Sequence, residues 1–157
     1  MSESTVVHDT FLIERTYPAP AERVFAYLAD PAKKRRWYAE SDGHEVEVFD
    51  MDFQVGGVEH SSYRMGAKTP FPGVVLASDG RFEDIAPDRR VVIASTMSLG
   101  GRRISTTLVT FELFGAGQAT RVALTHQGVF YEGSDGPQMR KGGWEALLDR
   151  LGRAMAQ

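Results

Sequence analysis

The sequence predicts an α+β domain in which a curved antiparallel sheet of about six to seven strands wraps around one long C-terminal helix. Three observations indicate this class. Extended segments and short turns alternate through residues 44–127, two short helical segments follow the first extended segment, and the chain ends in an amphipathic helix. Its 157 residues suit one domain, since single domains typically hold about 100–200 residues. We therefore expect a single domain over residues 1–157.

The N-terminal part of the chain predicts a strand followed by two short helices. Residues 9–17 carry β-branched and aromatic side chains in partial alternation, as strands do, and prolines follow them. Residues 21–29 place their apolar side chains on one face of a short amphipathic helix. Asp30 and Pro31 indicate the start of the second helix, because aspartate caps helix N-termini and proline is tolerated at the first helical position.

The middle of the chain predicts only strands and turns. The turns at residues 99–102 and 115–117 are so short that the strands they join must be antiparallel. Residues 66–73, which contain two prolines, predict a loop. One extended segment is expected to break near Asp79 and Gly80. The expected strands cover residues 44–50, 56–65, 74–86, 90–99, 104–114 and 118–127.

The last segment changes to a helical period. Trp144, Leu148, Leu151 and Met155 lie at i, i+4, i+7 and i+11, and they predict a helix of about three to four turns, entered through the glycines of residues 142–143. A sheet with one apolar face needs a cover, and this helix is the only element long enough to provide one. Because a sheet of this size curls as it twists, its concave face and the helix can leave space between them.

The composition excludes several functional classes. The chain has no cysteine, so disulfides, thiolate nucleophiles, Cys-ligated zinc and iron–sulfur clusters are ruled out. A net charge of −3 gives no electrostatic reason to expect nucleic acid binding. The N-terminus reads as polar and no apolar run approaches the roughly 20 residues that span a bilayer. We expect a cytoplasmic protein that uses no membrane and no cofactor.

No motif commits the chain to metal, nucleotide or nucleophilic chemistry. The glycines of residues 115–120 have strands on both sides, whereas a dinucleotide-binding loop leads from a strand into a helix. The basic residues 33–36 are expected to form a solvated helix face, with Trp37 and Tyr38 packing the helix pair onto the domain. No metal is expected, since no two histidines have the i, i+4 spacing of a zinc site among His8, His44, His60 and His126.

Six segments spread over nearly the whole chain match a known superfamily in their order and spacing. They are residues 17–25, Trp37, and residues 53–57, 82–91, 120–125 and 143–151. Together they resemble the START-like, or SRPBCC, helix-grip domains, and most closely the branch named after the activator of the heat-shock-protein-90 ATPase. The resemblance implies a pocket between the sheet and the C-terminal helix that takes apolar or aromatic ligands.

The superfamily does not imply one activity, because it includes lipid carriers, plant-hormone receptors and polyketide aromatase/cyclases. The branch takes its name from a eukaryotic co-chaperone in which a separate N-terminal domain precedes this one. The sequence shows no counterpart of that domain, which argues against the co-chaperone role. A homodimer is compatible with the sequence, although nothing in the sequence demands one.

Candidates for the cavity wall follow from the faces of the expected strands and the last helix. Tyr63 and Met65 share a strand face, and His126 shares one with two apolar residues that are expected to point inward. Residues 129–131 are a candidate lid before the final helix. Large aromatic and methionine side chains also serve as core filler, and that reading stays open for each. The candidates are Trp37, His60, Tyr63, Met65, Met97, His126, Phe130, Trp144 and Leu148.

Three functions remain open on this basis. The leading hypothesis is a binding domain for a small apolar or aromatic molecule. The second is an enzyme of the cyclase or dehydratase kind, which requires at least two acid–base groups converging in the cavity, from among His60, Tyr63, Arg64 and His126. The third is an interaction module that acts on a chaperone ATPase.

Overall fold

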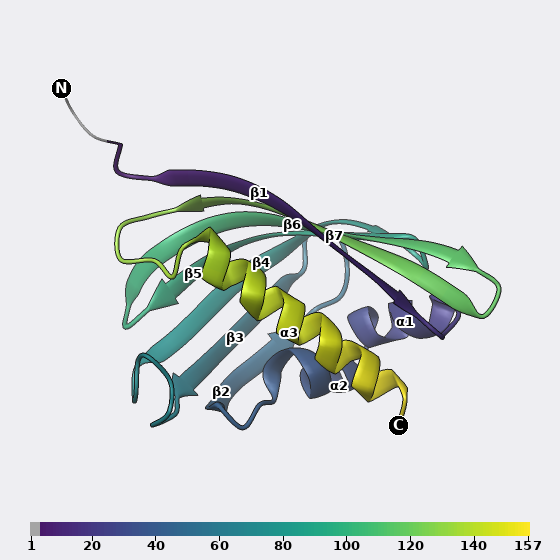
Figure 1. Ribbon diagram of the computed structural model, residues 1–157, viewed down its shortest axis with the longest axis horizontal. Helices are drawn as coiled ribbons and strands as arrows, with labels where there is room; N and C mark the ends of the chain where they lie inside the picture. The colour runs from purple at the N-terminus through teal and green to yellow at the C-terminus, as the bar shows by residue number, and fades with distance from the viewer. Residues whose placement is uncertain (1–3) are drawn as a thin grey trace.

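The computed structural model describes residues 4–157 and shows a seven-stranded antiparallel sheet, three short helical segments and one long helix (Figure 1). This is the α+β architecture expected from the sequence, with the C-terminal helix against the sheet. The elements in chain order are β1 (Val7–Tyr17), α1 (Ala21–Ala29), α2 (Pro31–Lys34), the π-helical turn η1 (Arg35–Ala39), β2 (His44–Met51), β3 (Val58–Met65), β4 (Val75–Ala86), β5 (Arg90–Leu99), β6 (Arg102–Ala116), β7 (Ala119–Phe130) and α3 (Pro137–Met155).

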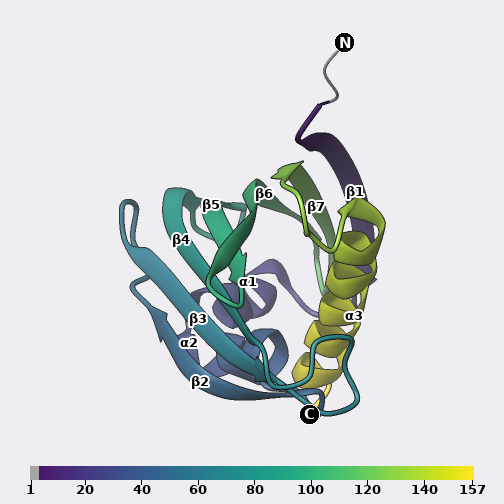
Figure 2. The same cartoon turned by 90° about the vertical axis from the view of Figure 1, so that its left-hand side faces the viewer.

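The strand order β1-β7-β6-β5-β4-β3-β2 puts β1 and β2 at opposite edges of the sheet, although they are consecutive in the chain. From β2 to β7, each strand is joined to the next by a short connection, and every pair of neighbouring strands is antiparallel. The segment between β1 and β2 must therefore cross the width of the sheet. It does so through α1, α2 and η1, which lie across one end of the curved sheet (Figure 2).

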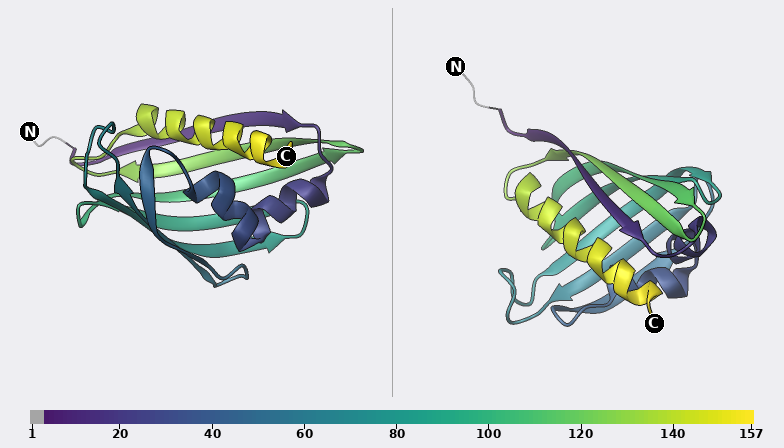
Figure 3. Two further views of the ribbon diagram at one scale, coloured as in Figure 1. Left: turned by 90° about the horizontal axis from the view of Figure 1, so that it is seen from below. Right: turned by 45° about the vertical axis from the view of Figure 1, so that its right-hand side comes forward.

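Helix α3 covers the concave face, lying beside β1 and crossing the strands of the far half of the sheet (Figure 3). Its C-terminal half is packed tightly, since Leu148 and Leu151 are completely buried. Polar contacts fix the same half: the Tyr17 hydroxyl donates to the Leu148 carbonyl at 2.7 Å, and Arg23 donates to the Met155 carbonyl at 2.6 Å. No helix within residues 4–157 is long and apolar enough to cross a membrane.

The second helical segment starts as expected but ends differently. The Asp30 carboxylate accepts hydrogen bonds from the backbone N–H groups of Ala32 and Lys33 at 2.9 and 3.3 Å, which caps α2. Helical turns then continue through η1, so Trp37 and Tyr38 lie within the helical segment. The buried Trp37 indole donates to the Tyr27 carbonyl at 2.8 Å, which anchors η1 on α1.

Three elements differ most from the sequence expectations. Strand β4 is continuous through Gly80, because the missing side chain makes room for Ile93 of β5; a Cβ there would lie 2.7 Å from the Ile93 Cδ1 atom. Strand β7 runs on to Phe130. Helix α3 has 19 residues and begins at Pro137, so the glycines at residues 142–143 lie inside it and not at its start.

Lys34 also departs from expectation. The basic residues 33–36 were predicted to form a solvated face, yet Lys34 is only 4% exposed and forms an ion pair with Glu59 of β3, itself 5% exposed. The ammonium group also lies 4.7 Å from the centre of the Tyr38 ring. A buried charge needs such a partner, so this pair holds the junction of α2 and η1 against β3.

We expect removal of one member of this pair to be more harmful than removal of both. Lys34→Met leaves the Glu59 carboxylate buried without a partner, which costs about 3–5 kcal/mol of unfolding free energy. Lys34→Met combined with Glu59→Leu leaves no uncompensated charge and should lose less than the single variant. Urea unfolding measures both. Lys33→Met is the control and should cost under about 1 kcal/mol; a double variant less stable than Lys34→Met would contradict the expectation.

Candidate functional site

A cavity of about 390 Å³ lies between the sheet and the face of α3 that runs from Met139 to Arg150. Strands β2 to β6 provide one side, the loop of residues 66–74 closes part of the rim, and α3 provides the other side. Most of the wall is apolar. The apolar side chains in it are Met65, Pro70, Phe71, Leu76, Met97, Leu99, Ile104, Met139, Trp144 and Leu147.

The sequence of α3 explains why the cavity opens widest beside the turns that contain Gly142 and Gly143. The C-terminal half presents buried apolar side chains to the core, whereas Gly142 and Gly143 present none. Gly143 lines the cavity, and a Cβ added to it would meet no atom within 4 Å. Trp144 separates the two halves, with its ring centre 5.9 Å from that of Phe111 and 6.0 Å from that of Tyr38.

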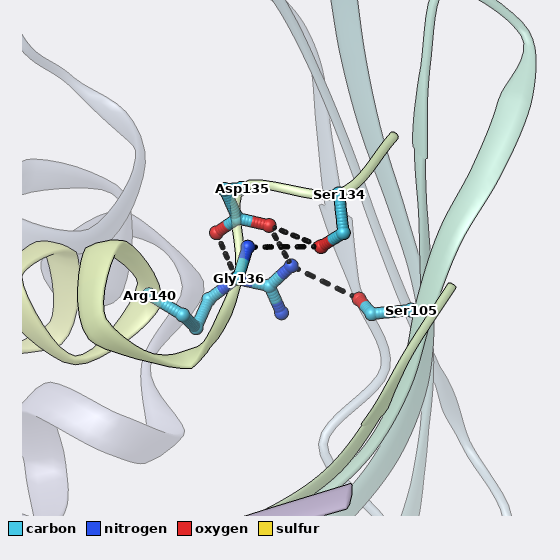
Figure 4. Close-up of polar contacts among 5 residues, drawn as sticks. All are labelled: Ser105, Ser134, Asp135, Gly136 and Arg140. Atoms are coloured by element: carbon cyan, nitrogen blue, oxygen red, sulfur yellow. Dashed lines mark hydrogen bonds and ion pairs between the residues drawn. The ribbon is translucent and has the colours of Figure 1, made fainter. Parts of the chain in front are cut away.

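An ion pair fixes the beginning of α3 relative to the sheet (Figure 4). Arg140 donates to both carboxylate oxygens of Asp135 at 2.7 Å, and it also donates to the Ser105 hydroxyl of β6 at 3.0 Å. Burial alone would raise the pKa of Asp135, but the hydrogen bonds and charge of Arg140 outweigh it and keep that pKa below its usual value. Both side chains border the cavity, and each neutralises the charge of the other.

Two polar atoms in the cavity wall have no hydrogen-bond partner, the Tyr63 hydroxyl and the Arg150 Nε. Burial raises the pKa of Tyr63 to about 12, so this hydroxyl keeps its proton at neutral pH and is available as a donor. The nearby Tyr38 hydroxyl also keeps its proton, since burial, and next the charge of Glu59, raise its pKa well above the ordinary value. His44 packs against the Tyr63 ring, with ring centres 4.5 Å apart.

Of the nine side chains predicted to form the cavity wall, the structure brings four to it, namely Tyr63, Met65, Met97 and Trp144. Trp37 and Leu148 are instead completely buried in the core. His60 lies on the other face of β3, where it is partly exposed and pairs with Asp79, because residues of opposite parity point to opposite faces of a strand. His126 and Phe130 point inward as expected but belong to an aromatic stack beside the cavity.

The acid–base groups of the enzyme hypothesis do not converge. Arg64 is exposed and pairs with Glu47, and neither His60 nor His126 lines the cavity, so Tyr63 is the only one of the four there. The predicted lid of residues 129–131 is not a separate loop, since Val129 and Phe130 belong to β7. Residues 66–74 take that position, with Thr69, Pro70 and Phe71 in the cavity rim. In residues 4–157 no group of three or more metal-binding side chains is assembled.

Sequence reasoning missed the charged residues of the site. Arg140, Gly143, Leu147 and Arg150 lie at i, i+3, i+7 and i+10 and share one face of α3. That period becomes visible only when the helix is started at Pro137. The same correction would have placed both arginines beside the cavity.

His126 lies within the core. Its ring stacks on Phe11 with centres 4.4 Å apart and faces Phe130 at 6.0 Å, and its Nδ1 atom has no hydrogen-bond partner. Burial, and next the positive charge of Arg140, lower the pKa of His126 to about 4. The imidazole is therefore neutral in the folded protein at all but acidic pH.

The sequence matches the family described as Activator of Hsp90 ATPase homolog 1-like protein over residues 18–156. Among curated proteins, no sequence matches the chain significantly.

Several solved structures share the fold. The Mll3558 protein from Rhizobium loti is 40% identical with a TM-score of 0.83, and the match covers 96% of this chain and 99% of that one. A protein from Rhizobium leguminosarum is 32% identical, with a TM-score of 0.88 and 96% of both chains covered. Protein CV1439 from Chromobacterium violaceum is 21% identical, with a TM-score of 0.79, and covers 94% of this chain and 97% of its own.

The buried His126 makes stability depend on pH. The unfolded chain takes up a proton near the ordinary pKa of about 6.5, whereas the folded protein resists protonation until about pH 4. The stabilisation is complete above pH 6.5 and is lost as pH falls toward 4, by roughly 3 kcal/mol in all. Urea unfolding at pH 7, 5.5 and 4 measures this slope. His126→Leu should flatten it, and an unchanged slope would exclude His126 as the cause.

Proposed function

We propose that this protein, which belongs to the Activator of Hsp90 ATPase homolog 1-like family, binds a small apolar or aromatic molecule between its sheet and α3. The observation that carries the proposal is the cavity of about 390 Å³ with a largely apolar wall. Its volume lies in the range of about 300–1,000 Å³ that is typical of small-molecule sites.

Physical chemistry favours occupation of such a space by an apolar molecule. Side chains that face an empty cavity lose the dispersion contacts that a packed interior provides. An apolar molecule that leaves water for this wall gains those contacts and about 25 cal/mol for each Å² of apolar surface buried. The chain itself leaves the space open at Gly143, where any larger residue would extend into free volume.

The rim of the cavity is also apolar. Phe71 from the loop after β3 is 36% exposed and Met139 from the first turn of α3 is 56% exposed. Both line the cavity and both reach the surface, so they mark a path between solvent and the interior. Exposed apolar side chains grouped at a concave opening are typical of ligand sites.

The residues in the wall support binding over acid–base catalysis. Of the four predicted acid–base groups only Tyr63 lies there, and its raised pKa of about 12 makes it a donor and not a base at neutral pH. His44 also lines the cavity, but its Nε2 is engaged by the Ala39 carbonyl at 2.5 Å. Native mass spectrometry of protein purified from its own cells is the direct test, since a ligand held in the cavity adds its mass to the protein.

A cavity-filling substitution should abolish binding without unfolding the protein. N-phenylnaphthylamine, a neutral aromatic probe, should bind the wild type with a rise in fluorescence. Gly143→Phe should weaken this binding about tenfold or more by occupying the space, a loss equivalent to about 1.4 kcal/mol. Gly142→Phe is the matched control, because Gly142 has equally open surroundings but does not line the cavity.

Both variants should keep or raise the thermal midpoint, since glycine inside a helix costs about 0.5–1 kcal/mol relative to a residue with a side chain. The proposal fails if the probe does not bind the wild type. It also fails if the two glycine variants bind the probe as well as the wild type does.

A further inference from the structure

Two arginines border the cavity, and only one of them has a carboxylate partner for its charge in the described part of the chain. Arg140 is fully engaged by the Asp135 carboxylate and the Ser105 hydroxyl. Arg150 forms no ion pair with any carboxylate in residues 4–157, and its buried Nε has no hydrogen-bond partner. A partly buried guanidinium without a counter-charge is unusual, because removing it from water carries a large cost.

The Tyr63 hydroxyl is a second donor without an acceptor. The side chain is 8% exposed, lines the cavity and has no hydrogen-bond partner for its hydroxyl. Tyr63 comes from β3 and Arg150 from α3, so the two donors reach the cavity from its two sides. An unsatisfied buried donor in a cavity wall is free to bond an acceptor that a ligand brings.

We propose that the ligand is an amphipathic acid, whose anionic oxygens accept hydrogen bonds from Arg150 and Tyr63 while its apolar body lies against Met97 and Trp144. This inference rests on the proposed function and narrows it from apolar molecules in general to carboxylates, sulfonates or similar anions with an apolar or aromatic body. Guanidinium and carboxylate pair well because their planar groups can form two parallel hydrogen bonds.

The alternatives fit these residues less well. A neutral ligand would leave the partly buried Arg150 charge without compensation, and a cation would be repelled by it. Protein carboxylates nearby do not neutralise Arg150: Glu40 is paired with Arg35 at 3.1 Å, and the exposed Asp42 borders only the outer depression next to Arg150.

Two fluorescent probes that share their aromatic rings separate the charge from the apolar body. Anilinonaphthalene sulfonate carries a sulfonate that N-phenylnaphthylamine lacks. The wild type should bind the sulfonate probe about tenfold or more tightly than the neutral probe, because a hydrogen bond to a charged group contributes about 1.5–3 kcal/mol. Titrations monitored by fluorescence give both dissociation constants.

Substitutions then assign this preference to residues. Arg150→Gln should remove it, lowering the affinity for the sulfonate probe about tenfold or more and leaving the neutral probe unaffected. Tyr63→Phe should lower sulfonate affinity about threefold while the thermal midpoint holds or rises, because the lost hydroxyl has no partner in the empty protein. Lys141→Gln removes an exposed charge from the same helix outside the cavity wall; it is the control and should change neither affinity.

The outcomes distinguish the two proposals. If neither probe binds the wild type, the proposed cavity function fails. If both probes bind with equal affinity, or if Arg150→Gln keeps the preference for sulfonate, the cavity function stands and the acid-ligand inference is overturned. Loss of the preference for sulfonate in Lys141→Gln as well would assign that preference to general surface charge and would overturn the inference too.

Discussion

One helix is too narrow to fill the concave face of a seven-stranded sheet, and the rest of the architecture follows from that mismatch. Seven strands spaced about 4.8 Å apart span roughly 29 Å, whereas a helix with its side chains is about 10–12 Å wide. The short segments α1, α2 and η1 fill the concave face beside the C-terminal half of α3. Beside the earlier turns of α3, from Met139 onward, no element of residues 4–157 does so, and the cavity remains.

Polar contacts keep this space open by holding α3 at both ends. The hydrogen bonds from Tyr17 and Arg23 fix its C-terminal half to β1 and α1, while Arg140 connects its first turns to Asp135 and to Ser105 of β6. A helix held at two points cannot sink onto the sheet between them. On the opposite side of the cavity, the buried ion pair of Lys34 and Glu59 holds α2 in place against β3.

The fold could be predicted from the sequence much further than the site. Period-two and helical patterns located the strands and the last helix, since burial of one face imposes these periods on the sequence. The polar parts of the site depend on distant contacts that no local pattern records. Lys34 looked solvated because its partner Glu59 is 25 residues away, and Arg140 was missed because two glycines were taken as the start of α3. The prediction that His126 points inward was correct, but the inward face of the sheet contributes to both the core and the cavity wall, and His126 lies in the core.

The glycines at residues 142–143 have a thermodynamic consequence for the helix that contains them. Each lowers helix stability by about 1 kcal/mol relative to alanine, so the first two turns of α3 are the part of the helix with the least intrinsic order. These turns also form one side of the cavity. Contacts that a ligand adds there stabilise the helical state of the same residues, and hydrogen exchange of their amides would report occupancy. The free energy needed to order these turns would therefore reduce the affinity for a ligand, and a ligand that binds would in turn stabilise the helix.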